Sequence, residues 1–284
     1  MSAASTSATR LSGIVNCTSD SFSDGGQYLD PRAAIEHARQ LHKEGATVVD
    51  VGAVSSNPDA DPVDPETEWQ RLQAVLPALM QEGIPISVDS FQTATQRRAL
   101  QTWPLFMLND IHGFSDPSLY PDLRAASCKL VVMHSIQASG KARRESWDAR
   151  KAGPIVDAVR AFFDKRLAVL SRAGIDPGRI VLDPGMGFFL GSEAQNSFQV
   201  LQSLATLRRE FELPLMISVS RKSFLGSRLN LPIQDRGSAT LAAELWALSQ
   251  GVDWIRTHDV RALHQAQAIW LAIRQANAAQ TPQV

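Results

Sequence analysis

Short apolar segments recur along the chain, each followed by a segment of helical length, and this alternation limits the fold more than any other feature. Most of the apolar segments are rich in Val, Ile or Leu and end in a polar residue, as is typical of strands covered on both faces. We predict eight strands, at residues 11–16, 47–52, 86–90, 106–110, 129–134, 179–183, 215–220 and 252–258.

The intervening segments predict helices at residues 31–44, 65–81, 93–102, 117–126, 155–172, 193–210, 238–250 and 260–276. Asp30 and Asp64 each precede a proline, which combines an N-cap with a favoured first helical residue. Alternating strands and helices imply parallel pairing with right-handed crossovers. Eight repeats predict an α/β fold of the (β/α)8 TIM-barrel type. An open doubly wound sheet is the alternative, and the lack of a Gly-x-Gly-x-x-Gly sequence after the first strand counts against it.

Length and charge are consistent with one enzyme domain. The chain has 284 residues, close to the ~250 of a typical barrel, so we expect a single barrel domain at 11–276 between a disordered tail (1–10) and a loose tail (277–284). A net charge of -1 without charged runs indicates neither nucleic acid nor membrane as a partner, and no apolar run approaches the ~18 residues of a membrane span. We expect a cytoplasmic protein in which Cys17 and Cys128 stay reduced.

Polar residues follow the predicted strands, and in such barrels the active site lies at the carboxyl ends of the strands. Carboxylate and amide groups there can pair with a ring edge that carries N–H and NH2 donors, whereas cations suit a phosphate. The candidate residues are Asn16, Asp50, Asp89, Asn109, Asp110, His134, Asp183, Lys222, Arg256 and His258. Asp50 could equally cap a turn, and His134 could equally be a packing residue. The pattern predicts a site for an aromatic heterocycle plus phosphate, with no zinc spacing, Gly-x-Ser-x-Gly elbow or P-loop.

Seven motifs make the prediction more specific. They lie at residues 13–26, 87–90, 108–111, 132–134, 182–188, 218–226 and 255–259. In sequence and order they resemble the motifs of dihydropteroate synthases, over about residues 11–274. The resemblance implies a barrel, usually a homodimer, that joins 6-hydroxymethyl-7,8-dihydropterin diphosphate to p-aminobenzoate and releases diphosphate with the aid of Mg2+.

The resemblance also implies residue roles. The pterin would be bound by Asp89, Asn109, Met133, Asp183 and Lys222, of which Asp89, Asp183 and Lys222 would be catalytic. The diphosphate would be bound by Asn16, Asn57, Arg256 and His258, with Asn16 also reaching Mg2+. The p-aminobenzoate would be bordered by Ser55, Ser56, Pro58, Phe188, Phe189 and Ser220. The loop that holds Asp24 would close over the site.

Two departures from the usual family pattern stand out. Ser56 and Asn57 replace a Thr and an Arg, and the loss of Arg removes a bidentate phosphate clamp that Arg221 or Arg228 could replace. Residues 185–191 contain an extra aromatic residue where a small residue is usual. Both departures resemble the mobile, sulfonamide-resistant (Sul) synthases. A steric interpretation is that Phe188 or Phe189 excludes the bulky substituent of a sulfonamide but admits flat p-aminobenzoate. The alternative is that both rings pack as core.

Two other functions are open at this point. A methyltransferase that transfers a methyl group from a folate to a corrinoid would share the pterin carboxylates, but the motifs at residues 16–26 and 220–223 match the synthases. A non-catalytic paralogue is favoured only by Asn57. Diphosphate release distinguishes these alternatives from a synthase.

Overall fold

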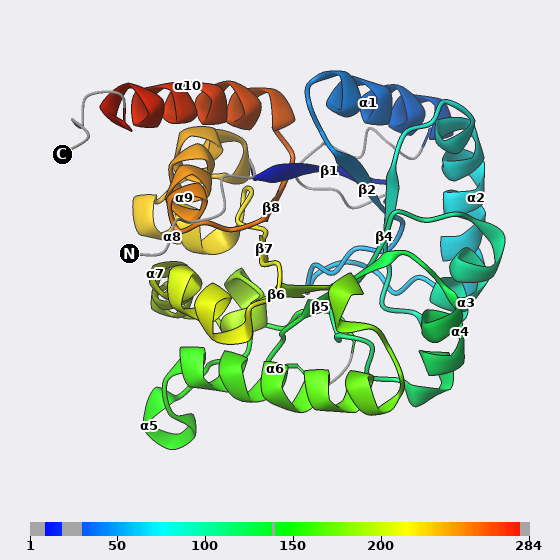
Figure 1. The fold of residues 1–284 in the computed structure, drawn as a ribbon, viewed down its shortest axis with the longest axis horizontal. Coiled ribbons are helices and arrows are strands. Elements are labelled where there is room, and N and C mark those ends of the chain that lie inside the picture. Colours follow the sequence, from blue (N-terminus) through cyan, green and yellow to red (C-terminus); the bar gives the residue numbers. More distant parts are fainter. Residues whose placement is uncertain (1–8, 19–29, 138–139, 279–284) are drawn as a thin grey trace.

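The computed structural model describes residues 9–18, 30–137 and 140–278, so Asp24 and its loop lie outside the described residues. The strands are β1 (Arg10–Asn16), β2 (Val48–Gly52), β3 (Ile86–Asp89), β4 (Met107–Asp110), β5 (Lys129–Met133), β6 (Ile180–Asp183), β7 (Met216–Ile217) and β8 (Trp254–Thr257). They form one parallel sheet in the order β6-β5-β4-β3-β2-β1-β8-β7. A parallel bridge between Leu182 and Leu215 connects β6 to β7 and closes the ring, which confirms the TIM barrel (Figure 1).

Helices surround the barrel, as Figure 1 shows. The long ones are α1 (Pro31–Lys43), α2 (Pro65–Gln81), α3 (Thr93–Thr102), α6 (Ile155–Arg172), α7 (Ala194–Phe211), α9 (Gly237–Ser249) and α10 (Val260–Ala278). Asp30 and Asp64 cap α1 and α2 as expected, because each carboxylate accepts a hydrogen bond from a backbone N–H of the first helical turn. The short ones are α4 (Tyr120–Ala125), α5 (Ala149–Ala152), α8 (Ser223–Leu229), η1 (Pro117–Leu119), η2 (Pro177–Arg179), η3 (Gly187–Leu190) and η4 (Ile233–Asp235).

The seventh strand is much shorter than predicted. Residues 215–220 were expected to be extended, but only Met216 and Ile217 are paired in β7. The chain then turns, and Arg221 adopts a left-handed backbone conformation with φ 56°. Val219 is fully buried in the core rather than paired, so its apolar character reflects packing. The first strand and the last helix are each slightly longer than predicted: β1 begins at Arg10 and α10 continues to Ala278.

Alternation along the strands places the polar residues of the site inside the barrel. One buried cluster within the ring consists of Val48, Met107, Val131, Val181, Met216 and Trp254. Successive side chains of a strand point to opposite faces, so the residue two positions further on points inward again, nearer the carboxyl end. Those residues are Asp50, Asn109, Met133, Asp183, Ser218 and Arg256. The barrel therefore has an apolar plug beneath a layer that is polar except for Met133.

Met107 tests the plug, because it is almost completely buried within it. We expect Met107→Ala to lower the free energy of unfolding by about 3 kcal/mol, since the substitution removes buried methylene groups and leaves a cavity. Urea titration followed by circular dichroism would measure this change. A loss below about 1 kcal/mol would show that the interior is not packed as described.

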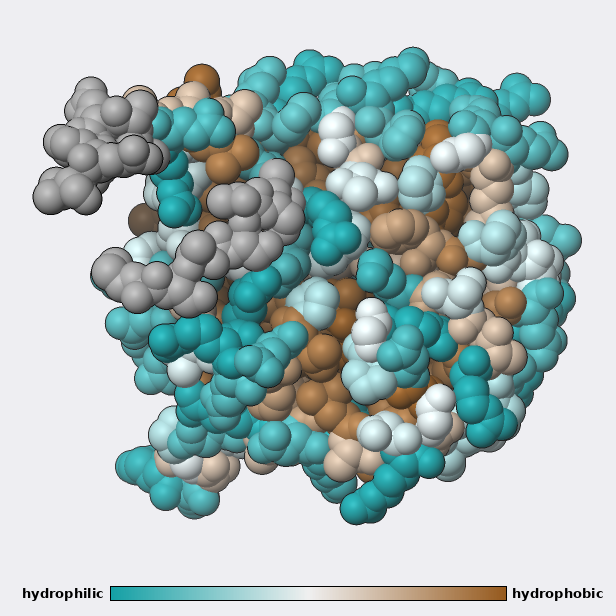
Figure 2. Space-filling model, viewed as in Figure 1, coloured by the Kyte–Doolittle hydropathy of each residue, from teal (hydrophilic) through white to brown (hydrophobic). Residues whose placement is uncertain are grey.

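Figure 2 shows how polar and apolar residues are distributed on one face of the molecule. Hydrophilic residues cover most of the rim of the face in Figure 2, with hydrophobic residues nearer its middle. Within the described part of the chain, no helix is long and apolar enough to cross a membrane.

Cys17 and Cys128 are buried and unpaired. Burial raises the pKa of the Cys17 thiol to about 12, so this thiol is a poor nucleophile.

Candidate active site

A cavity of about 550 Å³ opens among the carboxyl ends of the strands and the loops that follow them. Twelve of the predicted site residues line it: Asn16, Ser55, Ser56, Asn57, Pro58, Asp89, Phe188, Phe189, Ser220, Lys222, Arg256 and His258. The remaining three are buried next to these on the strands. Asn109 pairs in register with Asp89, and Met133 pairs with Asp183.

Arg256 is the electrostatic centre of the site. Its Nε donates to Asp50 Oδ2 at 2.5 Å, and its Nη2 donates to Asp89 Oδ2 at 2.6 Å. Asp50 therefore orients Arg256 and is not a turn cap. These contacts connect the ends of β2, β3 and β8, and they fix the guanidinium at the floor of the cavity.

Burial shifts the pKa values of the central groups towards neutrality. Burial raises the pKa of Asp89 to about 7, although the nearby Arg256 guanidinium acts in the opposite direction. Burial likewise raises the pKa of Asp183 to about 6, against the backbone N–H of Gly185 and the Lys222 ammonium. Lys222 is affected in the opposite sense: burial lowers its pKa to about 8, while Asp183 partly restores it. Such shifts are typical of functional sites.

Asn109 provides an unpartnered acceptor beside these charges. Its side chain is 4% exposed, and its Oδ1 has no hydrogen-bond partner among the described residues. A buried amide oxygen without a donor costs free energy unless a ligand supplies one. The position therefore suits a ligand with an N–H group.

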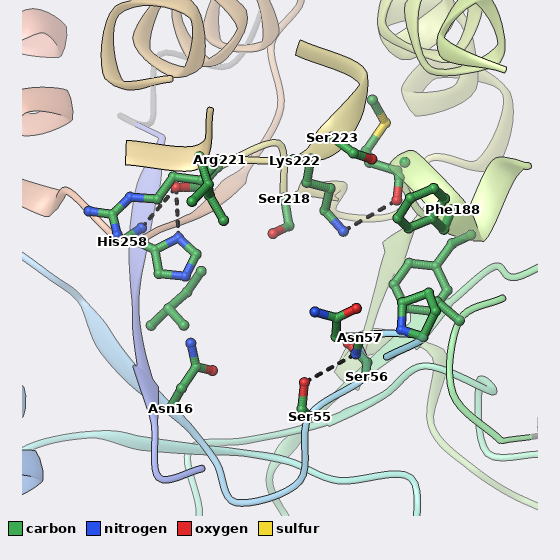
Figure 3. A pocket seen from close by; sticks show the side chains of 18 of the residues that line it. Asn16, Ser55, Ser56, Asn57, Phe188, Ser218, Arg221, Lys222, Ser223 and His258 are labelled. Atoms are coloured by element: carbon green, nitrogen blue, oxygen red, sulfur yellow. Dashed lines mark hydrogen bonds between the residues drawn. The ribbon is translucent and has the colours of Figure 1, made fainter. Parts of the chain in front are cut away.

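Cations and amide groups gather on one side of the cavity. In the view of Figure 3, Asn16, Arg221 and His258 lie across the cavity from Phe188. The imidazole Nδ1 of His258 lies 2.9 Å from the Ser220 hydroxyl, which also accepts the His258 backbone N–H at 3.2 Å. The pKa of His258 lies well below its usual value because the ring is buried and faces Arg221 and Arg256. A neutral imidazole can donate one hydrogen bond to an anion.

The loop after β2 is organised by its own hydrogen bonds. The Ser55 hydroxyl accepts the N–H of Asn57, and the Asn57 amide oxygen accepts the N–H of Asp59, each at 3.2 Å. Of the two candidates to replace the family arginine, Arg221 lines the cavity, whereas Arg228 lies in a separate groove.

The two phenylalanines differ in environment. Phe189 is 6% exposed and packs with Ile111, Met133 and Ala142. The centre of its ring lies 5.0 Å from the Lys222 Nζ atom. Phe188 is only partly buried, and its ring faces the cavity beside the loop after β2 (Figure 3). Phe188 is thus the ring that a ligand can reach most easily, and Phe189 mainly fills the wall behind it.

Some site residues could not be identified from the sequence. Ala142 and Arg144, from the segment between β5 and α5, and Arg236, directly before α9, line the cavity, and none of the three belongs to the motifs on which the sequence prediction rests. The basic composition of residues 141–144 was the one available signal. His134, in contrast, is a packing residue: it is buried, its Nδ1 lies 3.1 Å from the Pro184 carbonyl oxygen, and burial lowers its pKa to about 4.

Comparison with known proteins agrees with this geometry. Residues 12–258 match the model of a family described as pterin binding enzyme. The chain is 53% identical to dihydropteroate synthase type-2 of Escherichia coli over 263 residues. The matched segment covers 93% of this chain and 95% of that protein.

Solved structures are similar over almost the whole chain. A Xanthomonas albilineans dihydropteroate synthase with 4-aminobenzoic acid has a TM-score of 0.84 and 31% identity, covering 97% of this chain and 94% of that one. The Anaplasma phagocytophilum dihydropteroate synthase with bound 6-hydroxymethylpterin-monophosphate has a TM-score of 0.82 and 30% identity, covering 94% and 100%.

The chain therefore belongs to the pterin binding enzyme family. Within that family it is a member of the dihydropteroate synthases, which are transferases of folate biosynthesis.

Proposed function

We propose that this chain condenses 6-hydroxymethyl-7,8-dihydropterin diphosphate with p-aminobenzoate to give 7,8-dihydropteroate and diphosphate, and that it does so in the presence of sulfonamides. The observation that carries the reaction is the trio of Asp89, Asn109 and Asp183: Asp89 lines the cavity with Lys222 and Arg256, and Asn109 and Asp183 are buried beside it on the strands. Carboxylate and amide acceptors suit the donor edge of a pterin, and the orphan Asn109 oxygen is one such acceptor.

Each step of the proposed reaction is assigned to residues in or beside the cavity. The bond between the pterin methylene carbon and the diphosphate oxygen breaks, and the electron pair leaves with the diphosphate. Asp89 and Asp183 stabilise the positive charge that develops on the pterin. The neutral amino group of p-aminobenzoate then forms a C–N bond to the methylene carbon and loses one proton. Ser55, Ser56, Pro58, Phe188, Phe189 and Ser220 would hold the aminobenzoate end.

The diphosphate end corresponds to the cationic side of the cavity. Arg256 and His258 supply donors there, and Arg221, which lines the cavity whereas Arg228 does not, is the candidate to replace the missing family arginine. Lys222 donates to the Met186 carbonyl at 3.2 Å and lies between the pterin and aminobenzoate ends. Cations at the leaving group favour departure of the diphosphate.

Asn16 fits the expected Mg2+ as a single protein ligand. No group of three or more His, Cys, Asp or Glu that could hold a metal occurs in the part of the chain that the structure describes. Mg2+ usually keeps several waters and binds through few protein oxygens plus substrate phosphates, so one amide oxygen is sufficient. When bound, Mg2+ would neutralise charge on the leaving diphosphate.

A homodimer in the cytoplasm completes the proposal. A groove of about 500 Å³ between α7, α8 and α9 is lined by Leu225, Leu229 and Trp246, and the last two are 56% and 48% exposed. Exposed apolar surface of this kind often marks a protein–protein contact. We place the dimer contact there.

The pKa shifts of the carboxyl groups predict an acid limb in the pH profile. Asp89 and Asp183 must be ionised to accept from the pterin, and burial raises their pKa values to about 7 and about 6. The protonated, inactive forms therefore accumulate as the pH falls, and kcat/KM for the pterin substrate should fall below about pH 7. Because the substrate phosphate also titrates, binding of a phosphate-free pterin should be measured in parallel. Pterin affinity that stays constant down to about pH 5 would contradict these assignments.

Product formation tests the reaction itself. We expect the purified protein with Mg2+ to form dihydropteroate and to release one diphosphate per product, with p-aminobenzoate required for the new C–N bond. Mass spectrometry and a diphosphate assay measure the two products. Pterin binding without either product would favour the non-catalytic paralogue. Methyl transfer to a corrinoid would favour the methyltransferase.

A further inference from the structure

The turn that carries Phe188 and Phe189 is attached to its neighbours by its carbonyl groups. The Phe188 carbonyl accepts the Gln137 side-chain amide at 3.2 Å, and the Phe189 carbonyl accepts the Ile136 backbone N–H at 3.0 Å. The Leu190 carbonyl accepts the Asn196 side-chain amide at 2.8 Å. Gly187 and Gly191 flank these residues with φ of 66° and 101°, which few other residues adopt without strain. The turn therefore has permissive ends, and its middle is fixed by hydrogen bonds.

Among these hydrogen bonds, the one from Gln137 is the contact made by a side chain of the loop after β5. Both the oxygen and the nitrogen of the Gln137 side-chain amide form hydrogen bonds. Gln137 is only 6% exposed. The Ser135 hydroxyl donates to Gln137 Oε1 at 2.8 Å, so the Nε2 group faces the Phe188 carbonyl and, at 3.5 Å, the Arg143 carbonyl. Neither Ser135 nor Gln137 lines the cavity, so neither side chain reaches a substrate there.

A second contact to Phe188 comes from the solvent side. The Arg144 guanidinium lies 5.6 Å from the centre of the Phe188 ring and forms two hydrogen bonds, of 2.8 and 2.5 Å, with the Asp59 carboxylate. The side chains of Arg144 and Asp59 are 58% and 48% exposed. Exposed ion pairs contribute little. The Phe188 carbonyl also accepts the Gly191 backbone N–H at 3.2 Å, but that bond lies within the turn itself, so the Gln137 amide is the group that connects this carbonyl to the loop after β5. The Gln137 contact is therefore the side-chain restraint that holds the Phe188 backbone against its neighbour.

We propose that Gln137 is a positioning residue that sets the selectivity between p-aminobenzoate and bulkier sulfonamides, because it prevents the Phe188 turn from moving aside. This inference rests on the proposed function and deepens it. A flat carboxylate fits without displacing Phe188, so its affinity does not depend on the restraint. A ligand with a bulky sulfonyl substituent needs the ring to move, and a looser turn lowers the cost of that movement.

The test compares Gln137→Met, which keeps the length of the side chain but cannot donate, with Gln195→Met on the exposed surface of α7. The readout is the ratio of the sulfonamide Ki to the KM for p-aminobenzoate. We expect this ratio to fall about tenfold in Gln137→Met and to stay unchanged in Gln195→Met, with kcat within about twofold of the parent in both. Ser135→Ala, which leaves the donor in place but unoriented, should lower the ratio about threefold.

An unchanged ratio in a folded Gln137→Met protein would overturn the inference. A purely structural role would lower kcat and thermal stability together without changing the ratio, and that result would overturn it too. Should Gln137→Met fail to fold, Ser135→Ala decides by the same ratio. Failure of the proposed function is a different result, since the unmodified protein would then form no dihydropteroate.

Discussion

Asp89→Asn should lower kcat/KM for the pterin substrate by about 100-fold, equivalent to roughly 3 kcal/mol, while the protein stays folded. The substitution keeps the size of the side chain but removes the charge that lies 2.6 Å from Arg256 Nη2. In the proposed mechanism, the substitution removes an acceptor for the pterin and one of the two carboxylates that stabilise the developing cation. It also leaves Arg256 with Asp50 as its one carboxylate partner in the described structure. Steady-state kinetics with a diphosphate-release assay would measure the loss.

The matched control is Asp164→Asn, because Asp164 is exposed on the outer helix α6. The control should retain the parent kcat/KM, and both variants should keep the parent circular dichroism spectrum. Turnover that is unchanged in a folded Asp89→Asn protein would remove Asp89 from the site.

Phe188→Gly should lower the sulfonamide Ki by about tenfold or more, with a smaller change in the KM for p-aminobenzoate. The ring faces the cavity and is only partly buried, so its removal opens the space that a sulfonyl substituent needs. Forcing excess volume against a packed wall costs about 1–3 kcal/mol, which is roughly the discrimination expected from the clash. Inhibition kinetics against p-aminobenzoate would give the two constants.

Phe189→Gly is the informative comparison. This ring packs with Ile111 and Met133 behind the cavity, so its loss should lower thermal stability and kcat more than it changes drug selectivity. A restored sensitivity in Phe189→Gly alone would show that the rings have the opposite roles. If neither variant becomes sensitive, the steric explanation is wrong.

The repeated strand–helix pattern was sufficient to predict the barrel, because hydrophobic periodicity and capping residues can be recognised within short segments of the sequence. The same alternation placed Asp89, Asn109, Asp183 and Arg256 at one end of the ring, since parallel strands present their carboxyl ends together. It overestimated β7, because the buried Val219 resembles a strand residue in composition but lies in a turn.

Contacts between residues far apart in the sequence could not be predicted in this way. Asp50 and Arg256 are 206 residues apart, and their ion pair depends on strand register across the closed ring. Gln137 showed no periodic or motif signal, because its function depends on a carbonyl group 51 residues away. Such hydrogen bonds depend on the backbone paths of two irregular loops, which residue type alone does not specify.

This chain is a dihydropteroate synthase, and we propose that it excludes sulfonamides from its p-aminobenzoate site. Diphosphate release from the pterin substrate, measured with Mg2+ and p-aminobenzoate across a sulfonamide titration beside a drug-sensitive synthase, tests it most directly. We expect release to continue at drug concentrations that stop the sensitive enzyme. Release that stops in parallel for both enzymes would contradict the selectivity, and no release from the folded protein would contradict the reaction itself.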